Sequence, residues 1–270
     1  MRVRVTETEG EAERHREDRL VTEEPLEIRL TWPGRPAARA WVTMRTPGHD
    51  FELAAGWVTH EGLAPGGSTG QVRGVAYCTD ADLTREQEFN VVTVALAAPP
   101  PTDPTHRHAG SGGVGAGSAC GVCGKDSISA VLDVPRAPAW TGSLPSVDVV
   151  RRLPDLLRDR QAVFAKTGGV HAAGLATADG ELLLVREDVG RHNAVDKVTG
   201  ARVLAGERAA EAVLVVSGRA GFELVQKAVA VGMGALVAVG APSSLAAHLA
   251  REAGLALYGF TRRERTVRYA

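Results

Sequence analysis

The sequence lacks any segment that would carry the chain into or across a membrane. Its longest apolar run, residues 228–241, is shorter than the about 20 residues of a spanning helix, and glycines interrupt it. Residues 1–18 are charged from the start and contain no apolar stretch of the kind found in signal peptides. We therefore expect a cytoplasmic protein with no membrane partner.

An excess of charge of one sign is also missing. The 31 basic and 32 acidic residues leave a formal net charge of -1, so no overall attraction to nucleic acid follows. Lysine is rare beside arginine and occurs only at Lys125, Lys166, Lys197 and Lys227. We infer that these positions require a compact ammonium group in place of a planar guanidinium.

Cysteine is scarce as well. An odd count of 3 in a cytoplasmic chain argues against a disulfide framework and favours thiol chemistry or metal binding. Cys78 follows an expected strand and is interpreted as a buried small hydrophobe. Cys120 and Cys123 form a Cys-x-x-Cys pair, and this pair is the chemical centre of the sequence.

The composition predicts two domains of different class. At 270 residues and 44% hydrophobic content, the chain can bury a sizeable core. Residues 1–145 are expected to form a β-rich α+β N-terminal domain, and residues 146–270 a layered α/β domain. The expected strands of the first domain are residues 26–30, 40–44, 72–77 and 89–97, with one helix over residues 50–60 that Asp50 caps.

The second domain alternates between helix and strand. Ser146 caps a first helix, which we expect to be interrupted or to restart at Pro154. Two strands follow at residues 171–178 and 181–188 around a tight turn. The remaining helices are expected at residues 192–205, 220–231 and 243–253, and the remaining strands at residues 212–217, 235–240 and 255–260.

The cysteine pair lies beyond a segment that cannot form a core. Residues 99–117 are rich in proline, then histidine, then glycine, which predicts a mobile loop. Lys125 and the start of an expected helix would favour the thiolate form of a nearby cysteine. An accessible thiolate on a mobile loop suits persulfide transfer, in which Cys123 could accept the sulfur, protect Cys120 or resolve it to a disulfide.

Cys-x-x-Cys pairs also occur in zinc sites and in thioredoxin-like redox centres. A zinc site needs two more ligands, for which His106 and His108 are the nearest candidates. A thioredoxin-like centre would lie between an early strand and a long helix near the N-terminus, unlike this pair. Both interpretations are therefore weaker than sulfur transfer.

Three polar clusters lie where the α/β domain is expected to bind ligands. Asp188, Arg191, His192 and Asn193 follow a strand, and either ligand binding or helix capping with a structural His and Asn explains them. Ser217, Gly218 and Arg219 follow the next strand and could hold a phosphate, although they lack a complete Walker or Rossmann spacing. Arg262, Arg263 and Arg265 could bind phosphates or guanine edges, or could decorate a solvated strand end.

Several motifs occur together in order. They are SACGVCGK, AKTGGVHAAGLA, REDVGRHNAVDKVTG, VVSGRAGFELVQKA and GFTRRERTVRY. From about Pro47 onward the chain resembles the FdhD/NarQ family of formate dehydrogenase accessory sulfurtransferases. The resemblance implies a cytoplasmic homodimer that takes sulfur from a cysteine desulfurase and transfers it to the molybdenum bis-molybdopterin guanine dinucleotide cofactor, before the cofactor enters formate dehydrogenase.

The resemblance also implies which residues act. Cys120 matches the persulfide-carrying position and Cys123 the second cysteine. The cofactor-contacting segment matches Phe260, Thr261, Arg262, Arg263, Glu264 and Arg265. No zinc or other metal ligand is expected.

The resemblance further implies that the second domain is similar to the cytidine deaminase-like fold. Deaminase chemistry needs a glutamate two residues after the histidine, and Ala173 stands there after His171. We treat His171 as a structural histidine or a ligand contact.

The alternative function is a non-catalytic chaperone of the molybdenum cofactor or the dehydrogenase, in which the cysteine pair is a redox latch.

Overall fold

The computed structural model describes residues 1–64, 70–80, 82–85, 87–102, 104 and 135–270. The N-terminal half contains β1 (Arg2–Glu9), β2 (Ala12–Arg19), β3 (Glu24–Trp32), β4 (Arg35–Arg45), α1 (Asp50–His60), β5 (Val72–Tyr77) and β6 (Val91–Leu96). The C-terminal half contains α3 (Val147–Asp159), α4 (Ala162–Thr167), β7 (His171–Ala176), β8 (Leu182–Asp188), α5 (Arg191–Leu204), β9 (Val213–Val216), α6 (Phe222–Val231), β10 (Ala235–Ala238), α7 (Ser244–Ala253), β11 (Ala256–Arg262) and β12 (Arg265–Arg268).

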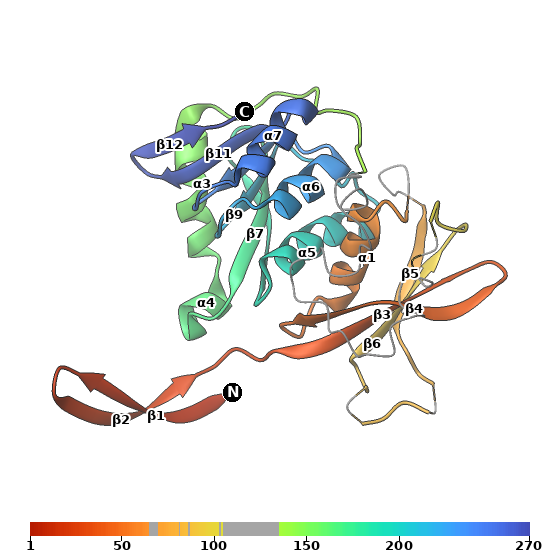
Figure 1. Cartoon of the computed structure of the whole chain (residues 1–270), viewed down its shortest axis with the longest axis horizontal. Coiled ribbons are helices and arrows are strands. Elements are labelled where there is room, and N and C mark those ends of the chain that lie inside the picture. The colour runs from red at the N-terminus through yellow and green to blue at the C-terminus, as the bar shows by residue number, and fades with distance from the viewer. Residues whose placement is uncertain (65–69, 81, 86, 103, 105–134) are drawn as a thin grey trace.

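These strands form three sheets, which are separated in Figure 1. β1 and β2 make a hairpin that projects from the rest of the chain. A four-stranded sheet has the order β4-β3-β6-β5, and a six-stranded sheet has the order β12-β11-β10-β9-β7-β8. The mixed α/β architecture expected from the sequence is therefore present.

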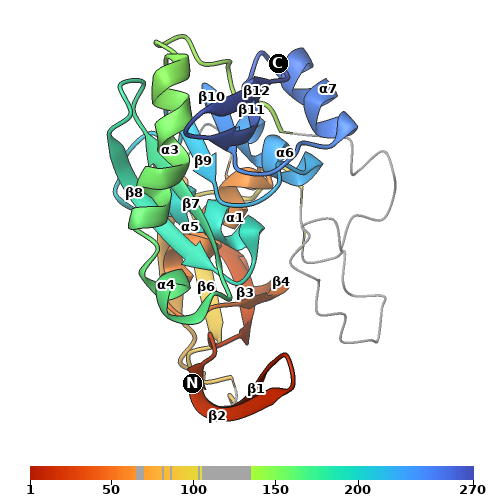
Figure 2. The ribbon, with the colours of Figure 1, turned by 90° about the vertical axis from the view of Figure 1, so that its left-hand side faces the viewer.

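The six-stranded sheet is the middle of a three-layer sandwich. Strand residues alternate between its faces: Val213 and Val215 pack against α3, while Leu214 and Val216 pack toward α5, α6 and α7. Figure 2 shows α3 on one side of this sheet and α6 and α7 on the other. Because both faces are covered, the central parallel strands β9 and β10 are continuous apolar runs.

Helix α1 belongs to two cores. Leu53, Ala54 and Trp57 pack against the four-stranded sheet, whereas Ala55 joins the core of the six-stranded sheet. On that second side α1 crosses α5 at backbone contact, because a Cβ atom at Gly56 would lie 1.9 Å from Asp196 O and one at Gly200 would lie 1.7 Å from Glu52 O. This crossing joins the two halves, and the boundary at residue 145 stays a prediction.

The predicted elements were largely found, with four corrections. The hairpin β1–β2 and the last strand β12 were not expected, since their charged sequences resemble loops. The first helix of the second half neither breaks nor restarts at Pro154, because α3 continues through this buried residue to Asp159. Asp50 is not an N-cap: His49 occupies that position with φ 60°, and the Asp50 carboxylate accepts hydrogen bonds from Arg45 at 3.0 Å.

Candidate functional site

A cavity of about 780 Å³ opens at one edge of the six-stranded sheet. It lies where β9 and β10 end and β7 begins, with the end of β11 and the α3–α4 region forming further walls. The residues that line it are Pro154, Asp155, Leu157, Arg158, Gln161, Phe164, Gly168, Gly169, Val170, His171, Val189, Ser217, Val239, Thr261, Arg262 and Arg263. Its volume suits a ligand of nucleotide size.

The sheet topology explains this position. β9, β10 and β11 run parallel, so their carboxyl ends meet at one edge. β7 is antiparallel to β9 and therefore begins at that same edge, with the end of β8 beside it. Ligands of α/β sheets commonly bind outside the carboxyl ends of the strands.

Only part of the predicted cofactor-contacting segment, residues 260–265, lines the cavity. Thr261, Arg262 and Arg263 line the cavity, while Phe260, Glu264 and Arg265 are not among its lining residues. Phe260 adopts φ 50° at an irregularity in the β11–β12 pairing and is 38% exposed. A bulge of this kind redirects side chains, and here it leaves Phe260 on the surface, with the Arg265 guanidinium carbon 5.4 Å from the ring centroid.

The cavity wall carries several cations and one carboxylate. Arg262 and Arg263 come from the end of β11 and its turn, and Arg158 comes from α3. Arg158 stacks over the ring of Phe164, with 3.8 Å between the guanidinium carbon and the ring centroid. Arg263 forms an ion pair with Asp155, so Arg158 and Arg262 are the guanidinium groups best placed to attract an anion.

His171 lies in the same wall. Burial lowers the pKa of its imidazole, and the nearby charge of Arg191 acts in the same direction. The ring is consequently neutral at pH 7 and can both donate and accept a hydrogen bond. His171 lines the cavity, and its two interpretations, a structural histidine and a ligand contact, both stay predictions.

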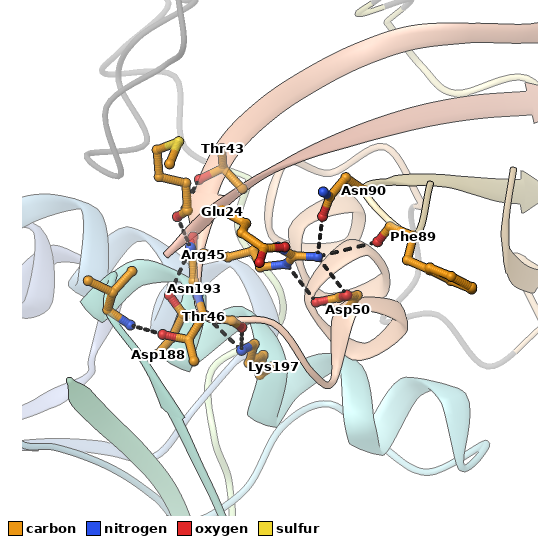
Figure 3. A network of polar contacts seen from close by, with 12 residues as sticks. Glu24, Thr43, Arg45, Thr46, Asp50, Phe89, Asn90, Asp188, Asn193 and Lys197 are labelled. Atoms are coloured by element: carbon orange, nitrogen blue, oxygen red, sulfur yellow. Dashed lines mark hydrogen bonds and ion pairs between the residues drawn. The ribbon is translucent and has the colours of Figure 1, made fainter. Parts of the chain in front are cut away.

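Asp188 instead has a structural role, which Figure 3 shows. Its fully buried carboxylate lies 2.7 Å from Lys197 Nζ and accepts hydrogen bonds from the backbone N–H groups of Thr46 and Gly190 and from the Asn193 side chain. Asn193 also donates to Met44 O at 2.8 Å. This network ties the end of β4 to the β8–α5 junction, so Asp188 is a structural residue. It does not cap α5, because Gly190 is the N-cap residue and, among the described residues, no side chain accepts a hydrogen bond from the first turn.

The other polar residues singled out in the sequence lie in different places. His192 is buried, with Nε2 at 3.0 Å from Glu223 Oε2. Ser217 lines the cavity, and its Oγ accepts a hydrogen bond from Ala172 N at 2.9 Å. Arg219 is exposed and is not a lining residue, so the expected phosphate cradle is represented in the cavity by Ser217 alone.

Two lysines do require a compact ammonium group. Lys197 and Lys227 are 1% and 5% exposed, and Lys227 Nζ lies 2.7 Å from Asp196, which also bonds His60 at 2.6 Å. A larger, planar guanidinium group at these buried pairs would need the surrounding core to move, so the two positions agree with the inference. Lys166, by contrast, is exposed on α4.

The predicted catalytic cysteines lie outside the described residues. Lys125, His106 and His108 also lie outside the described residues. The roles of Cys120 and Cys123 stay predictions. Cys78 is described, and the expectation that it is buried is wrong. It follows the edge strand β5, is partly exposed, and lies 3.6 Å from Arg29 Nη1.

Among the described residues, no group of three or more His, Cys, Asp or Glu side chains is placed to hold a metal ion. In the same part of the chain, no helix has both the length and the apolar character that crossing a bilayer would require.

Four residues of the cavity wall belong to none of the motifs noted in the sequence: Asp155, Arg158, Gln161 and Phe164.

Comparison with known proteins identifies relatives along nearly the whole chain. The model of the FdhD/NarQ family matches residues 21–270, a longer range than the resemblance from Pro47. The chain is 48% identical to the sulfur carrier protein FdhD of Streptomyces avermitilis, over 92% of this chain and 85% of that one. It is 46% identical to the protein of the same description in Nocardia farcinica, over 97% and 90% of the two chains.

A solved structure has the same fold. The crystal structure of a proposed formate dehydrogenase accessory protein from Desulfotalea psychrophila superimposes with a TM-score of 0.71 at 21% identity. The match covers 100% of this chain and 96% of that one.

Proposed function

The chain belongs to the FdhD/NarQ family, and from that membership we propose that it is a sulfurtransferase serving formate dehydrogenase. It accepts persulfide sulfur from a cysteine desulfurase on Cys120 and transfers that sulfur to the molybdenum bis-molybdopterin guanine dinucleotide cofactor. The observation that carries the proposal is the match to relatives described as sulfur carrier proteins at 46–48% identity. The family match spans residues 21–270, the range that contains both Cys120 and Cys123.

The first step needs no external oxidant. The Cys120 thiolate attacks the terminal sulfur of the desulfurase persulfide, and a new S–S bond forms on Cys120. The S–S bond of the donor breaks, and the donor cysteine leaves as a thiolate that then takes a proton. Cys123 is close enough in sequence to protect this persulfide or to resolve it.

The cavity supports the second part of the proposal. The acceptor cofactor carries phosphates and guanine rings, and Arg262, Arg263 and Thr261 line a cavity of nucleotide size. His171 adds a neutral hydrogen-bonding group to the same wall. We further propose that the protein acts in the cytoplasm as a homodimer, and that its six-stranded domain is related to the cytidine deaminase-like fold.

Mass spectrometry tests the sulfur step. The purified protein is incubated with a cysteine desulfurase and cysteine, and the Cys120 peptide is expected to gain the mass of one sulfur atom. Cys78→Ala is the matched control and should load sulfur normally, since Cys78 lies at the edge of the small sheet beside Arg29. A Cys120 peptide without added sulfur would contradict the proposal.

Cys120→Ala separates sulfur transfer from the chaperone alternative. A sulfur carrier loses its support of dehydrogenase activity with this substitution but still binds the cofactor. A chaperone would keep a dehydrogenase active with the same variant.

A further inference from the structure

Gln161 is a buried side chain with an unused amide in the wall of the cavity. The residue is 4% exposed and lines the cavity between α3 and α4. Within the residues that the structure describes, its Nε2 has no hydrogen-bond partner. A buried amide donor without a partner is costly, so such groups usually meet a ligand or an ordered water.

The local fold does not use this amide. Gln161 is the N-cap residue of α4, a position from which a side chain often accepts hydrogen bonds from the first N–H groups of a helix. In this protein Glu187 of β8 accepts both of those bonds, from Val163 N and Phe164 N, each at 2.8 Å. Glu187 therefore caps α4, and the Gln161 side chain is left without a structural task.

The surroundings of Gln161 indicate the chemistry of the ligand. Much of the cavity wall is apolar, and these residues are Pro154, Leu157, Phe164, Val170, Val189 and Val239. Arg158 and Arg262 lie in the same cavity, and Asp155 does not pair with either of them as it does with Arg263. Apolar walls, a single neutral amide and cationic side chains together suit a heterocycle with a hydrogen-bonding edge and an anionic tail.

We propose that Gln161 hydrogen-bonds the edge of the guanine base, while Arg158 and Arg262 bind the phosphates of the same nucleotide. This inference rests on the proposed function, which supplies a guanine nucleotide as part of the acceptor. The amide offers both a donor and an acceptor, as does the guanine edge, with its N–H group beside a carbonyl oxygen. Gln161 is thus a positioning residue for the base and takes no part in the sulfur step.

The test compares a ligand that has a base with one that lacks it. Gln161→Met keeps the length of the side chain and removes the amide. We expect this variant to bind guanosine diphosphate about tenfold more weakly and inorganic pyrophosphate as well as the parent protein does. Arg262→Ala should weaken the binding of both ligands, and Gln226→Met, at a buried glutamine outside the cavity, should weaken neither.

A stability measurement distinguishes this role from a structural one. Since the amide has no partner in the fold, Gln161→Met should leave the free energy of unfolding unchanged or raised. A clear fall in that free energy, or equal loss of guanosine diphosphate and pyrophosphate binding, would overturn the inference.

Failure of the inference differs from failure of the proposed function. If the parent protein binds guanosine diphosphate and Gln161→Met binds it equally well, only the role of Gln161 is wrong. If the parent protein binds no guanosine diphosphate, the inference and the nucleotide part of the proposed function are both wrong. Sulfur loading on Cys120 then decides separately whether the sulfur step stands.

Discussion

Lys197 Nζ lies 2.7 Å from the Asp188 carboxylate, and the two residues are 1% and 0% exposed. The same ammonium group donates to Thr46 O at 2.9 Å and to Glu187 O at 3.4 Å. The pair therefore joins three segments that are distant in sequence: the end of β4, the end of β8 and the middle of α5 (Figure 3). Val189, next to Asp188, lines the cavity, so this pair also supports the candidate site.

Removing the ammonium group of Lys197 should strongly lower the stability of the fold. Lys197→Met leaves the Asp188 carboxylate buried without its cation, which we expect to lower the free energy of unfolding by about 3–5 kcal/mol. Chemical denaturation measures this change. Lys166→Met, at an exposed lysine, is the matched control and should change the free energy by less than about 0.5 kcal/mol.

The crossing of α1 and α5 predicts a strong effect of one methyl group. In Gly56→Ala, the added Cβ would lie 1.9 Å from Asp196 O, so the two backbones must separate. We expect a loss of at least about 1–3 kcal/mol of unfolding free energy, measured by denaturation. Gly74→Ala is the control, since a Cβ there meets nothing within 4 Å; equal effects of the two substitutions would contradict the contact.

Stability should fall as the solution becomes acidic. Burial lowers the pKa of His60 despite its hydrogen bond to Asp196, so the folded protein keeps this ring neutral. The unfolded chain takes up a proton near pH 6.5 and the folded chain does so only at lower pH. Stability from this group is therefore complete above about pH 6.5 and is lost below it.

The pKa of His171 is lowered as well, so His171 also lowers the stability of the fold as the pH falls. Thermal or chemical unfolding measured from about pH 8 to about pH 5 checks the prediction. His60→Gln should flatten the decline, with a slope difference of at most about 1.4 kcal/mol per pH unit. An unchanged slope would show that His60 is not the group responsible.

The N-terminal hairpin should be dispensable. Among the strands that the structure describes, β1 and β2 pair only with each other; they are largely exposed and lie before the residues that the family model matches. Deleting residues 1–19 should leave the melting temperature and the sulfur loading of Cys120 unchanged. A fall in either would assign the hairpin a role in stability or in contact with the desulfurase.

The fold could be predicted where periodicity was strong. The helix at Asp50–His60 and the alternation of helices and strands after residue 146 were expected, because apolar spacing indicates them directly. Strands β1, β2 and β12 are charged, and they form because a hairpin partner supplies their hydrogen bonds. Pro154 was expected to interrupt a helix, but α3 continues through that residue, with Leu153 and Leu157 buried in the core beside the sheet.

The site was predicted only in part for a similar reason. Arg262 and Arg263 belong to a recognisable motif, and the cavity contains them. Gln161 and Arg158 belong to no motif, because they reach the cavity only through the packing of α3 and α4 beside the sheet. Local sequence also could not show that Glu187 would cap α4 and leave Gln161 available.

The glycine crossing of α1 and α5 also affects how the protein is made. Residues 61–190 separate the two helices, so at ribosomal rates of about 5–20 residues per second α1 waits on the order of ten seconds for its partner. During that interval the face of α1 that carries Ala55 and Gly56 is open to other chains. We therefore expect the N-terminal half expressed alone to keep this face of α1 exposed, because α5 is the element that covers it.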